Sequence, residues 1–373
     1  MEREFIVLCG EHYNPLGIIR SLGEAGIKPI AIVKKNEFQL TSKSKYIKKL
    51  HFVNSIEEGF NLLLETYANE KCPPYVYTAD DKTMTHIDQH YDEIRGRAFC
   101  FNAGKPGRIT FYMNKDNINR IAIKHGLNVL NATVVNKGEI PSGLEYPIIT
   151  KPIASTMGAW KGDMYICNSE KDLKEAYGKI LSEKLLLQKY IHKKNEYCLE
   201  GLSVAHGQSV AISIASSYNY ILDNGYSPYM TVRNFDKPAL GEKLKEILKE
   251  IGYEGIFEIE FLVDENDQLW FCEINFRNST WSYASTCAGM NLPYKWAEYM
   301  RQGKIDSDFI KKVPSDFTAM VEVHNYANRV KTNKISKLQW FNELRKCKCR
   351  YFLGKNDLMP VLSMFMHKLE GKR

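Results

Sequence analysis

The residues best suited to chemistry lie in one predicted β-hairpin, GIFEIEFLVDENDQLWFCEINFRNS, at residues 255–279. Because side chains alternate between the faces of a strand, one face is almost wholly apolar. The opposite face takes Glu258, Glu260, Glu273, Asn275 and Arg277. Sheets with one solvated face are common, yet three carboxylates on one face repel one another unless a cation neutralises them. Carboxylate and amide oxygens suit Mg²⁺, and an arginine beside them could stabilise phosphoryl charge. A solvated sheet and phosphoryl chemistry are therefore the two alternatives.

Two lysines and a loop rich in glycine and serine lie upstream of this hairpin. Lys115 opens a predicted helix, and Lys151 ends a predicted buried strand, YPIITK. The loop IASTMGAWKGD follows, and its backbone N–H groups could cover phosphates. A predicted strand at 185–191 carries Gln188, which could meet the edge of an adenine. A surface lysine and an ordinary hairpin loop are the plainer explanations of the separate pieces.

Taken in order, these pieces resemble the ATP-grasp superfamily of carboxylate–amine ligases. The order is Lys115, Lys151 with its loop, QKYI with Glu196 after it, then EIEF and EINFR. The resemblance spans roughly residues 1–300, and the joined E…E-x-N-x-R hairpin is its specific part. The segments IIRSLGEAGIKPIAI and SKSKYIKK also resemble D-aspartate ligase and related predicted ATP-dependent carboligases.

The resemblance implies a role for each matching residue. The residues that it assigns to ATP are Lys115 and Lys151 on the phosphates, Ser155, Thr156 and Gly158 in a flexible lid loop, Gln188, Lys189 and Ile191 at the adenine hinge, and Glu196 on the ribose. The implied metal ligands are Glu260, Glu273 and Asn275, holding two Mg²⁺ ions or Mn²⁺ in their place. Arg277 and Lys151 would be catalytic, with Arg277 stabilising the transferred phosphate and the acyl intermediate. Two departures from the family pattern are Gln188 where Glu is common, and N-F-R in place of N-P-R.

The elements that must position these residues fall into two kinds. Predicted strands at 5–10, 28–33, 46–53 and 75–79 alternate with helices, which predicts a parallel α/β sheet. The first strand is followed by GEHYNPLG, which lacks the G-x-G-x-x-G pattern and argues against a nicotinamide cofactor. From about Lys115 the pattern is α+β with antiparallel strands.

The family resemblance turns this pattern into four expected domains. They are a pre-ATP-grasp domain at 1–112, a small ATP-grasp subdomain at 113–193, a large subdomain with the metal site at 194–325, and a basic C-terminal extension at 326–373.

Composition excludes several classes without naming a function. The chain has 373 residues, and 51 Lys and Arg against 44 Asp and Glu leave a net charge of +7. That excess is too mild to indicate a nucleic-acid partner. Nine scattered cysteines without a C-x-x-C pair suggest reduced thiols. With no apolar run of 18 residues and no segment typical of a secretory signal, we expect a cytoplasmic protein.

The C-terminal tail differs from the rest of the chain. Residues 329–355 hold nine Lys and Arg against a single acidic residue, Glu343, and apolar residues then recur at helical spacing over 361–369. This pattern is compatible with weak contact to an anionic membrane surface or to a lipid-linked substrate. The plainer explanation, which we favour, is a helix packed on the core beside a solvated run of charge.

The family resemblance implies an enzyme, an ATP-dependent ligase that forms a C–N bond through an acylphosphate and releases ADP and phosphate. Its partners would be a small-molecule carboxylate and amine, with D-aspartate and a cell-wall or surface-polymer precursor as the most concrete case. A homodimer is compatible with the sequence. The alternatives are a carboxylase that works through carboxyphosphate, and a nucleotide-binding regulatory protein without turnover.

Overall fold

The structure, a computed structural model, describes residues 3–153, 160–222 and 225–370. The predicted lid-loop residues Ser155, Thr156 and Gly158 lie outside this described part. The chain divides into two compact units, which we describe separately. The first comprises Met1–Ile109, Cys198–Glu258 and Asn275–Arg373, and the second comprises Thr110–Tyr197 and Ile259–Ile274.

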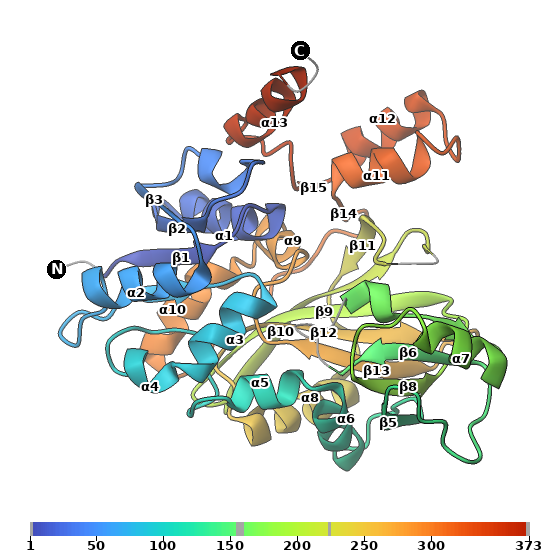
Figure 1. Ribbon diagram of the computed structural model, residues 1–373. Helices are drawn as coiled ribbons and strands as arrows, with labels where there is room; N and C mark the ends of the chain where they lie inside the picture. The colour runs from blue at the N-terminus through green and yellow to red at the C-terminus, as the bar shows by residue number, and fades with distance from the viewer. Residues whose placement is uncertain (1–2, 154–159, 223–224, 371–373) are drawn as a thin grey trace. The chain divides into compact units, whose positions relative to one another are not determined.

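The first unit opens with a parallel four-stranded sheet (Figure 1). Its strands, in the spatial order β3-β2-β1-β4, are β1 (Phe5–Cys9), β2 (Ile30–Lys34), β3 (Lys49–Val53) and β4 (Tyr75–Tyr77). The intervening helices are α1 (Tyr13–Glu24), α2 (Ile56–Thr66), α3 (Asp81–Gln89) and α4 (Tyr91–Ile94), with a 3-10 turn η1 (Thr41–Lys43). All neighbouring strands pair in parallel, so the predicted βα array is confirmed.

Local sequence explains the approach of helix to sheet in this array. The side chain of His12 caps α1 by accepting a hydrogen bond from the Asn14 N–H, so the helix begins at Tyr13, directly after the loop that follows β1. Gly59 lets α2 lie close against the strands, because a Cβ there would stand 2.7 Å from a methyl carbon of Leu8. The carboxyl ends of β1 and β4, where ligands of such sheets gather, lead into His12 and Asp81.

A seven-stranded sheet follows, in the order β13-β12-β9-β10-β11-β14-β15. Its strands are β9 (Asn195–Val204), β10 (Ser209–Tyr218), β11 (Tyr229–Arg233), β12 (Gly255–Val263), β13 (Leu269–Asn275), β14 (Thr318–Met320) and β15 (Cys349–Arg350). Strands β9, β12 and β13 run from one unit into the other. Strands β12 and β13 form the predicted hairpin, with a turn closed by the Asp267 N–H and the Asp264 carbonyl.

The second unit contains an antiparallel four-stranded sheet in the order β5-β8-β6-β7. Its elements are α6 (Lys115–Lys124), β5 (Ala132–Asn136), β6 (Ile148–Pro152), the 3-10 turn η2 (Trp160–Asp163), β7 (Ile166–Cys167), α7 (Glu170–Tyr177) and β8 (Lys184–Lys189). The core between α7 and the sheet includes Leu173, Ile148 and Leu185, all nearly inaccessible to solvent. Antiparallel pairing after a parallel sheet confirms the predicted fold class, α/β followed by α+β.

The remaining helices are α5 (Arg108–Met113), whose residues are divided between the two units, and α8 (Pro238–Ile251), α9 (Ser282–Cys287), α10 (Leu292–Gln302), α11 (Glu322–Arg329), α12 (Lys337–Lys346) and α13 (Met359–Glu370) in the first unit. A buried ion pair joins Arg20 of α1 to Asp357 and so holds the segment just before α13 against α1. None of the helices in the described ranges is both long and apolar enough to cross a membrane.

Candidate active site

In the second unit, Lys115 at the start of α6 forms an ion pair with Glu273 of β13. Asn114 caps the helix by accepting backbone N–H bonds from its first turn. Burial alone would lower the pKa of Lys115, but the Glu273 carboxylate outweighs it, Glu260 adds to the effect, and the pKa is raised. The structure thus brings a predicted ATP-binding lysine together with a predicted metal ligand, and the lysine stays charged.

The predicted metal ligands lie on the two strands of the hairpin. Glu260 is on β12, while Glu273 and Asn275 are two residues apart on β13 and so project from the same strand face. Glu273 is 31% exposed and therefore reachable by a small ion. In the described ranges no three His, Cys, Asp or Glu side chains gather as a metal cage. Two carboxylates and an amide instead fit Mg²⁺, which takes other ligands from phosphates and water.

Lys151 and Gln188 also meet in the second unit. Lys151 lies on β6, Gln188 lies on the adjacent strand β8, and the Lys151 Nζ donates to the Gln188 Oε1 at 2.7 Å. Gln188 is 6% exposed, so this contact is shielded from water. A predicted phosphate-binding lysine is therefore held by the predicted hinge residue, through an oxygen that carries no formal charge.

The other residues predicted to contact the adenosine of ATP are Lys189, Ile191 and Glu196, and each lies in a different local environment. The Lys189 N–H is already bonded to the Asn131 carbonyl, so the sheet uses this donor. Ile191 lies past the end of β8 and is partly buried. Glu196, predicted to hold the ribose, is buried at 8% exposure and forms an ion pair with Lys193. Lys193 thus neutralises the one carboxylate assigned to the sugar.

In the first unit, Arg277 is held by a chain of hydrogen bonds. Its Nε donates to Asp81 Oδ1 at 2.6 Å, and its Nη2 donates to Asn275 Oδ1 at 3.1 Å. Asn275 in turn donates to the Glu258 carboxylate at 2.9 Å. Arg277 and Asp81 are 16% and 20% exposed. The guanidinium is therefore fixed in direction and still accessible, which suits the stabilisation of charge on a substrate.

A buried pair of carboxyl groups, Glu200 and Glu258, supports that chain. Glu200 of β9 is fully buried and accepts hydrogen bonds from the hydroxyls of Ser279 and Ser282, at 2.7 and 2.6 Å. Burial raises the pKa of Glu200 to about 7, against the lowering effect of the two serines. Burial and the neighbouring Glu200 raise the pKa of Glu258 well above its usual range. Near neutral pH the two groups therefore carry at least one proton.

Sequence reasoning missed Asp81 and Glu200 as functional neighbours of Arg277. Asp81 follows the carboxyl end of a parallel strand, where ligands gather, but its pairing with Arg277 left no local signal. Glu200 left a weaker signal, an acidic residue inside the otherwise apolar run CLEGLSV. In the hairpin, Glu258 was placed on a polar face, yet it is only 6% exposed.

The loop after β1 is tied into the first unit by side-chain amides. The Asn14 Nδ2 donates to the Ala79 and Asn278 carbonyls at 2.9 and 3.0 Å, and Asn278 donates back to Asn14 at 2.8 Å. Burial, then His324 and Arg277, lower the pKa of His12 to about 4. Asn14 therefore fixes the loop that joins β1, β4 and the segment after Arg277, and His12 is neutral at physiological pH.

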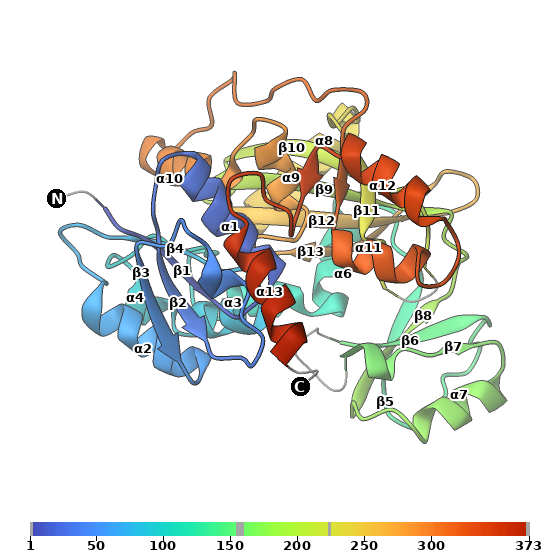
Figure 2. The ribbon, with the colours of Figure 1, turned by 90° about the horizontal axis from the view of Figure 1, so that it is seen from above.

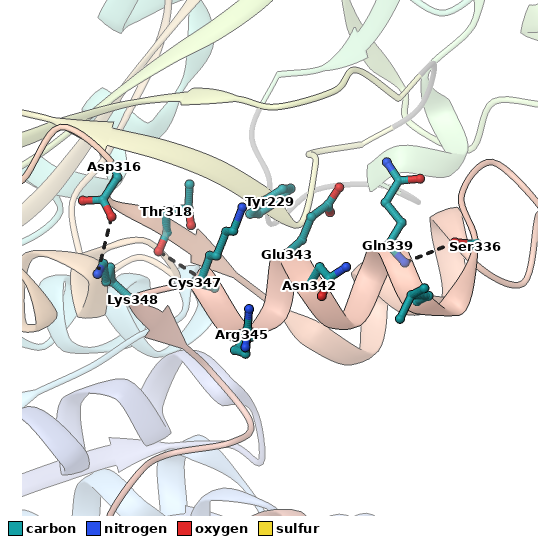
Figure 3. A pocket seen from close by; sticks show the side chains of 12 residues that line it. Tyr229, Asp316, Thr318, Ser336, Gln339, Asn342, Glu343, Arg345, Cys347 and Lys348 are labelled. Carbon is teal, nitrogen blue, oxygen red and sulfur yellow. Dashed lines mark hydrogen bonds and ion pairs between the residues drawn. The ribbon is translucent and has the colours of Figure 1, made fainter.

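The first unit also has a hollow with a different lining. It has a volume of about 650 Å³ and is lined by Tyr229, Asp316, Thr318 and residues between Ser336 and Lys348, all in the first unit (Figure 3). No predicted site residue lines it. The charged groups described above, and not this hollow, match the chemistry that the sequence predicts.

Residues 108–299 match the family described as carbamoyl-phosphate synthase L chain, ATP binding domain. That segment is more than half of the chain and contains Lys115, Lys151, Glu273 and Arg277. A relative among characterised proteins is the 2-oxoglutarate carboxylase small subunit of Hydrogenobacter thermophilus. It is 24% identical over 291 residues, which cover 70% of this chain and 58% of that protein.

Two solved structures share the fold. The L-amino acid ligase from Bacillus licheniformis has a TM-score of 0.64 and 13% identity, covering 85% of this chain and 79% of that chain. The biotin carboxylase domain dimer of the Hydrogenobacter thermophilus 2-oxoglutarate carboxylase, in complex with MgADP, ADP and bicarbonate, has a TM-score of 0.64 and 17% identity. It covers 85% of this chain and 74% of that chain.

Proposed function

Because the chain belongs to the family of the carbamoyl-phosphate synthase L chain ATP binding domain, we propose that it uses ATP to join a carboxylate to an amine. The observation that carries this proposal is the fixed guanidinium of Arg277, held by Asp81 and Asn275. A protein that only senses a nucleotide has no need of a pre-oriented cation next to its metal ligands. A ligase needs one, because negative charge accumulates during phosphoryl and acyl transfer.

The first step transfers the γ-phosphoryl group of ATP. A carboxylate oxygen of the substrate attacks the γ-phosphorus, the bond from phosphorus to the β,γ-bridging oxygen breaks, and ADP leaves. Lys115 and Lys151 bind phosphate oxygens and offset their charge. Each lysine exchanges its present partner, Glu273 or Gln188, for a phosphate oxygen.

Glu260, Glu273 and Asn275 would hold Mg²⁺, which when bound supplies further neutralisation of the phosphate oxygens. Lys115 now neutralises Glu273, so a metal ion at this carboxylate would release the lysine toward the nucleotide. Two ions and the use of Mn²⁺ are parts of the same proposal.

The second step forms the amide. The amine nitrogen attacks the carbonyl carbon of the acylphosphate and the bond from carbon to the phosphate oxygen breaks. The departing phosphate takes the proton that the nitrogen loses. Arg277 stabilises the oxyanion and the departing phosphate. Exclusion of water is required, since water would hydrolyse the acylphosphate.

Carboxylation is the second candidate. Its support is the similarity to the 2-oxoglutarate carboxylase small subunit, although the chain spans only 58% of that protein's length. In this version bicarbonate replaces the carboxylate and carboxyphosphate replaces the acylphosphate. The regulatory alternative has less support, because both lysines, the carboxylates and Arg277 are all present.

The finer parts of the proposal concern substrate and setting. The amino acid would be D-aspartate or a similar one, joined to a cell-wall or surface-polymer precursor, and the active form would be a homodimer. Use of ATP and nine free cysteines support a cytoplasmic location. The four-part division at 1–112, 113–193, 194–325 and 326–373 remains a prediction.

An isotope experiment tests the reaction class. The full chain is incubated with MgATP and pairs drawn from D- and L-amino acids, short peptides and amines, and ADP release is measured. Carboxylates labelled with ¹⁸O should pass one ¹⁸O to phosphate, because the attacking oxygen leaves with it. Labelled ¹³C-bicarbonate tests the carboxylase version, which alone puts ¹³C into an organic product.

The Glu273→Gln variant is the site control, and exposed Glu183→Gln of the same unit is its matched control. Release of ADP with ¹⁸O transfer and an amide product supports the ligase. Nucleotide binding without ADP release for any pair tested would overturn both enzyme versions and leave the regulatory one.

A further inference from the structure

Helix α12 is anchored to the first unit by one of its faces. Trp340 and Leu344 are 7% and 8% exposed and belong to an apolar cluster with Met320. The Trp340 Nε1 donates to Asn325 Oδ1 at 2.9 Å, and Ser336 caps the helix. The helix is therefore held in a defined orientation, and its other face is turned to solvent.

That outer face carries two large apolar side chains. Leu338 is 73% exposed and Phe341 is 58% exposed. They are three residues apart, so they lie on the same side of the helix. Burying an exposed leucine or phenylalanine is favourable, and an outward-facing pair on an anchored helix marks a contact surface rather than an incomplete core.

Three lysines lie just before this pair in the chain, Lys337 in the first turn of α12 and the other two in the connection that precedes the helix. Lys331, Lys334 and Lys337 are exposed, and none of the three has an ion-pair partner in the part of the chain that the structure describes. The single carboxylate within the basic segment, Glu343, is already used by Arg329. In this segment Arg329 is therefore paired, whereas the three lysines at the start of α12 and in the connection before it are exposed without an ion pair among the described residues.

We propose that the outer face of α12 with Leu338, Phe341 and Lys337, together with Lys331 and Lys334 of the connection before the helix, binds the surface of an anionic phospholipid bilayer. The lysines meet the lipid phosphates, and the two apolar side chains enter the boundary between headgroups and acyl chains. A second copy of this chain fits the face less well, because it would bring the same lysines against these. The inference does not depend on ligase activity.

Helix α13 lies on the same side of the first unit, at the top of Figure 1 and toward the viewer in Figure 2. It leaves Leu358, Met359, Leu362 and Met366 about half exposed, and Val361 buried. The helix predicted at 361–369 is therefore only partly packed on the core. The hollow in Figure 3 is lined by both basic and acidic side chains, so it does not favour an anionic surface as the helix face and its lysines do.

Vesicle sedimentation of the full chain tests the proposal. The probes are vesicles of phosphatidylcholine alone and of phosphatidylcholine mixed with phosphatidylglycerol. We expect sedimentation with the anionic vesicles only, weakening as salt is added. The triple variant K331A/K334A/K337A should lower partitioning by about tenfold or more, since each lysine contributes electrostatic attraction. The variant L338S/F341S should also lose binding, but its salt dependence should change less than that of the triple lysine variant.

The matched control is K28A/K35A/K71A, which removes the same charge from exposed lysines elsewhere in the first unit. It should bind nearly as the parent does, and circular dichroism should show all variants folded. Absence of sedimentation with anionic vesicles overturns the proposal, as does equal loss in the control. Tighter retention by duplex DNA or RNA, abolished by the same lysine variant, would overturn it in favour of a nucleic acid.

Discussion

The two units hold their functional cations in different ways. In the second unit, Lys115 and Lys151 each donate to one side-chain oxygen among the described residues, from Glu273 and Gln188. In the first unit, two guanidinium nitrogens of Arg277 donate to different side chains, Asp81 and Asn275. Asn275 in turn donates to the buried carboxyl group of Glu258. A single contact is readily exchanged for a ligand oxygen, whereas a doubly held side chain keeps its direction.

This difference corresponds to two tasks. Phosphate-binding groups must release their partners when a nucleotide arrives and take them back when it leaves. A group that stabilises developing charge works best when its orientation is fixed beforehand, because no reorganisation is then needed during the reaction. We therefore expect changes in the second unit to alter nucleotide binding and changes around Arg277 to alter turnover.

The largest effect should come from Arg277→Ala. We expect turnover, measured as ADP release, to fall by about a thousandfold or more, because the variant loses charge stabilisation made in the transition state. Nucleotide affinity, measured by calorimetry, should stay within about threefold of the parent. Exposed Arg301→Ala of α10 is the matched control and should be silent. A large loss of nucleotide affinity in Arg277→Ala would contradict the assignment of nucleotide binding to the second unit and of turnover to the residues around Arg277.

The exchange at Lys115 predicts opposite responses to Mg²⁺. In Glu273→Gln the lysine loses its charged partner, so binding of metal-free ADP should be unchanged or tighter. Its gain in affinity on adding Mg²⁺ should disappear, and turnover should fall by about a hundredfold. Lys115→Ala should instead weaken ADP with or without Mg²⁺. Titration calorimetry separates these outcomes, with exposed Lys171→Ala of the second unit as control. Identical behaviour of the two variants would contradict the exchange.

The buried pair in the first unit predicts a dependence of stability on pH. The pKa of Glu200 is raised from 4.5 to about 7 in the folded state, so the folded chain binds its proton more tightly than the unfolded chain. This stabilisation is complete below pH 4.5 and is lost as the pH rises through 7. In Glu200→Gln the neutral amide should flatten that decline, leaving the variant more stable than the parent at pH 8 by about 1–3 kcal/mol.

Urea unfolding at several pH values measures this difference, and Glu242→Gln, which is 71% exposed, is the control. If the unfolding free energies of the parent and of Glu200→Gln fall in parallel from pH 5 to 8, the prediction is wrong and the pKa of Glu200 is not raised by folding. The hydrogen-bonded chain behind Arg277 would then contain an ionised Glu200 rather than a pair of carboxyl groups that retains a proton.

The sequence alone predicted the elements well because their signals are local. The strands at 5–9 and 255–263 are continuous or alternating apolar runs, and the hairpin turn at Asp264–Asp267 is a cluster of turn formers. The pairing of Arg277 with Asp81 could not be predicted, because the two residues are 196 positions apart and depend on tertiary contacts.

Burial of polar residues was harder still to predict. Period-2 alternation placed Glu258 on the polar face of the hairpin, but Glu258 lies against the buried Glu200 of the neighbouring strand and is itself buried. The basic tail shows the converse limit, since spacing predicted the helix at 361–369 and left open which of its residues would be buried. The structure answers that with Val361 buried and Leu362 exposed.

The smallest effect expected within the comparison is at Glu196, which is paired with Lys193 in the second unit. If this carboxylate holds the ribose, it contacts the nucleotide equally before and during phosphoryl transfer. Glu196→Gln should therefore raise KM for ATP by about three- to tenfold and leave kcat unchanged. Steady-state kinetics with exposed Glu183→Gln as control measures this. A fall in kcat with constant KM would place Glu196 with Arg277, among the groups that act in the transition state.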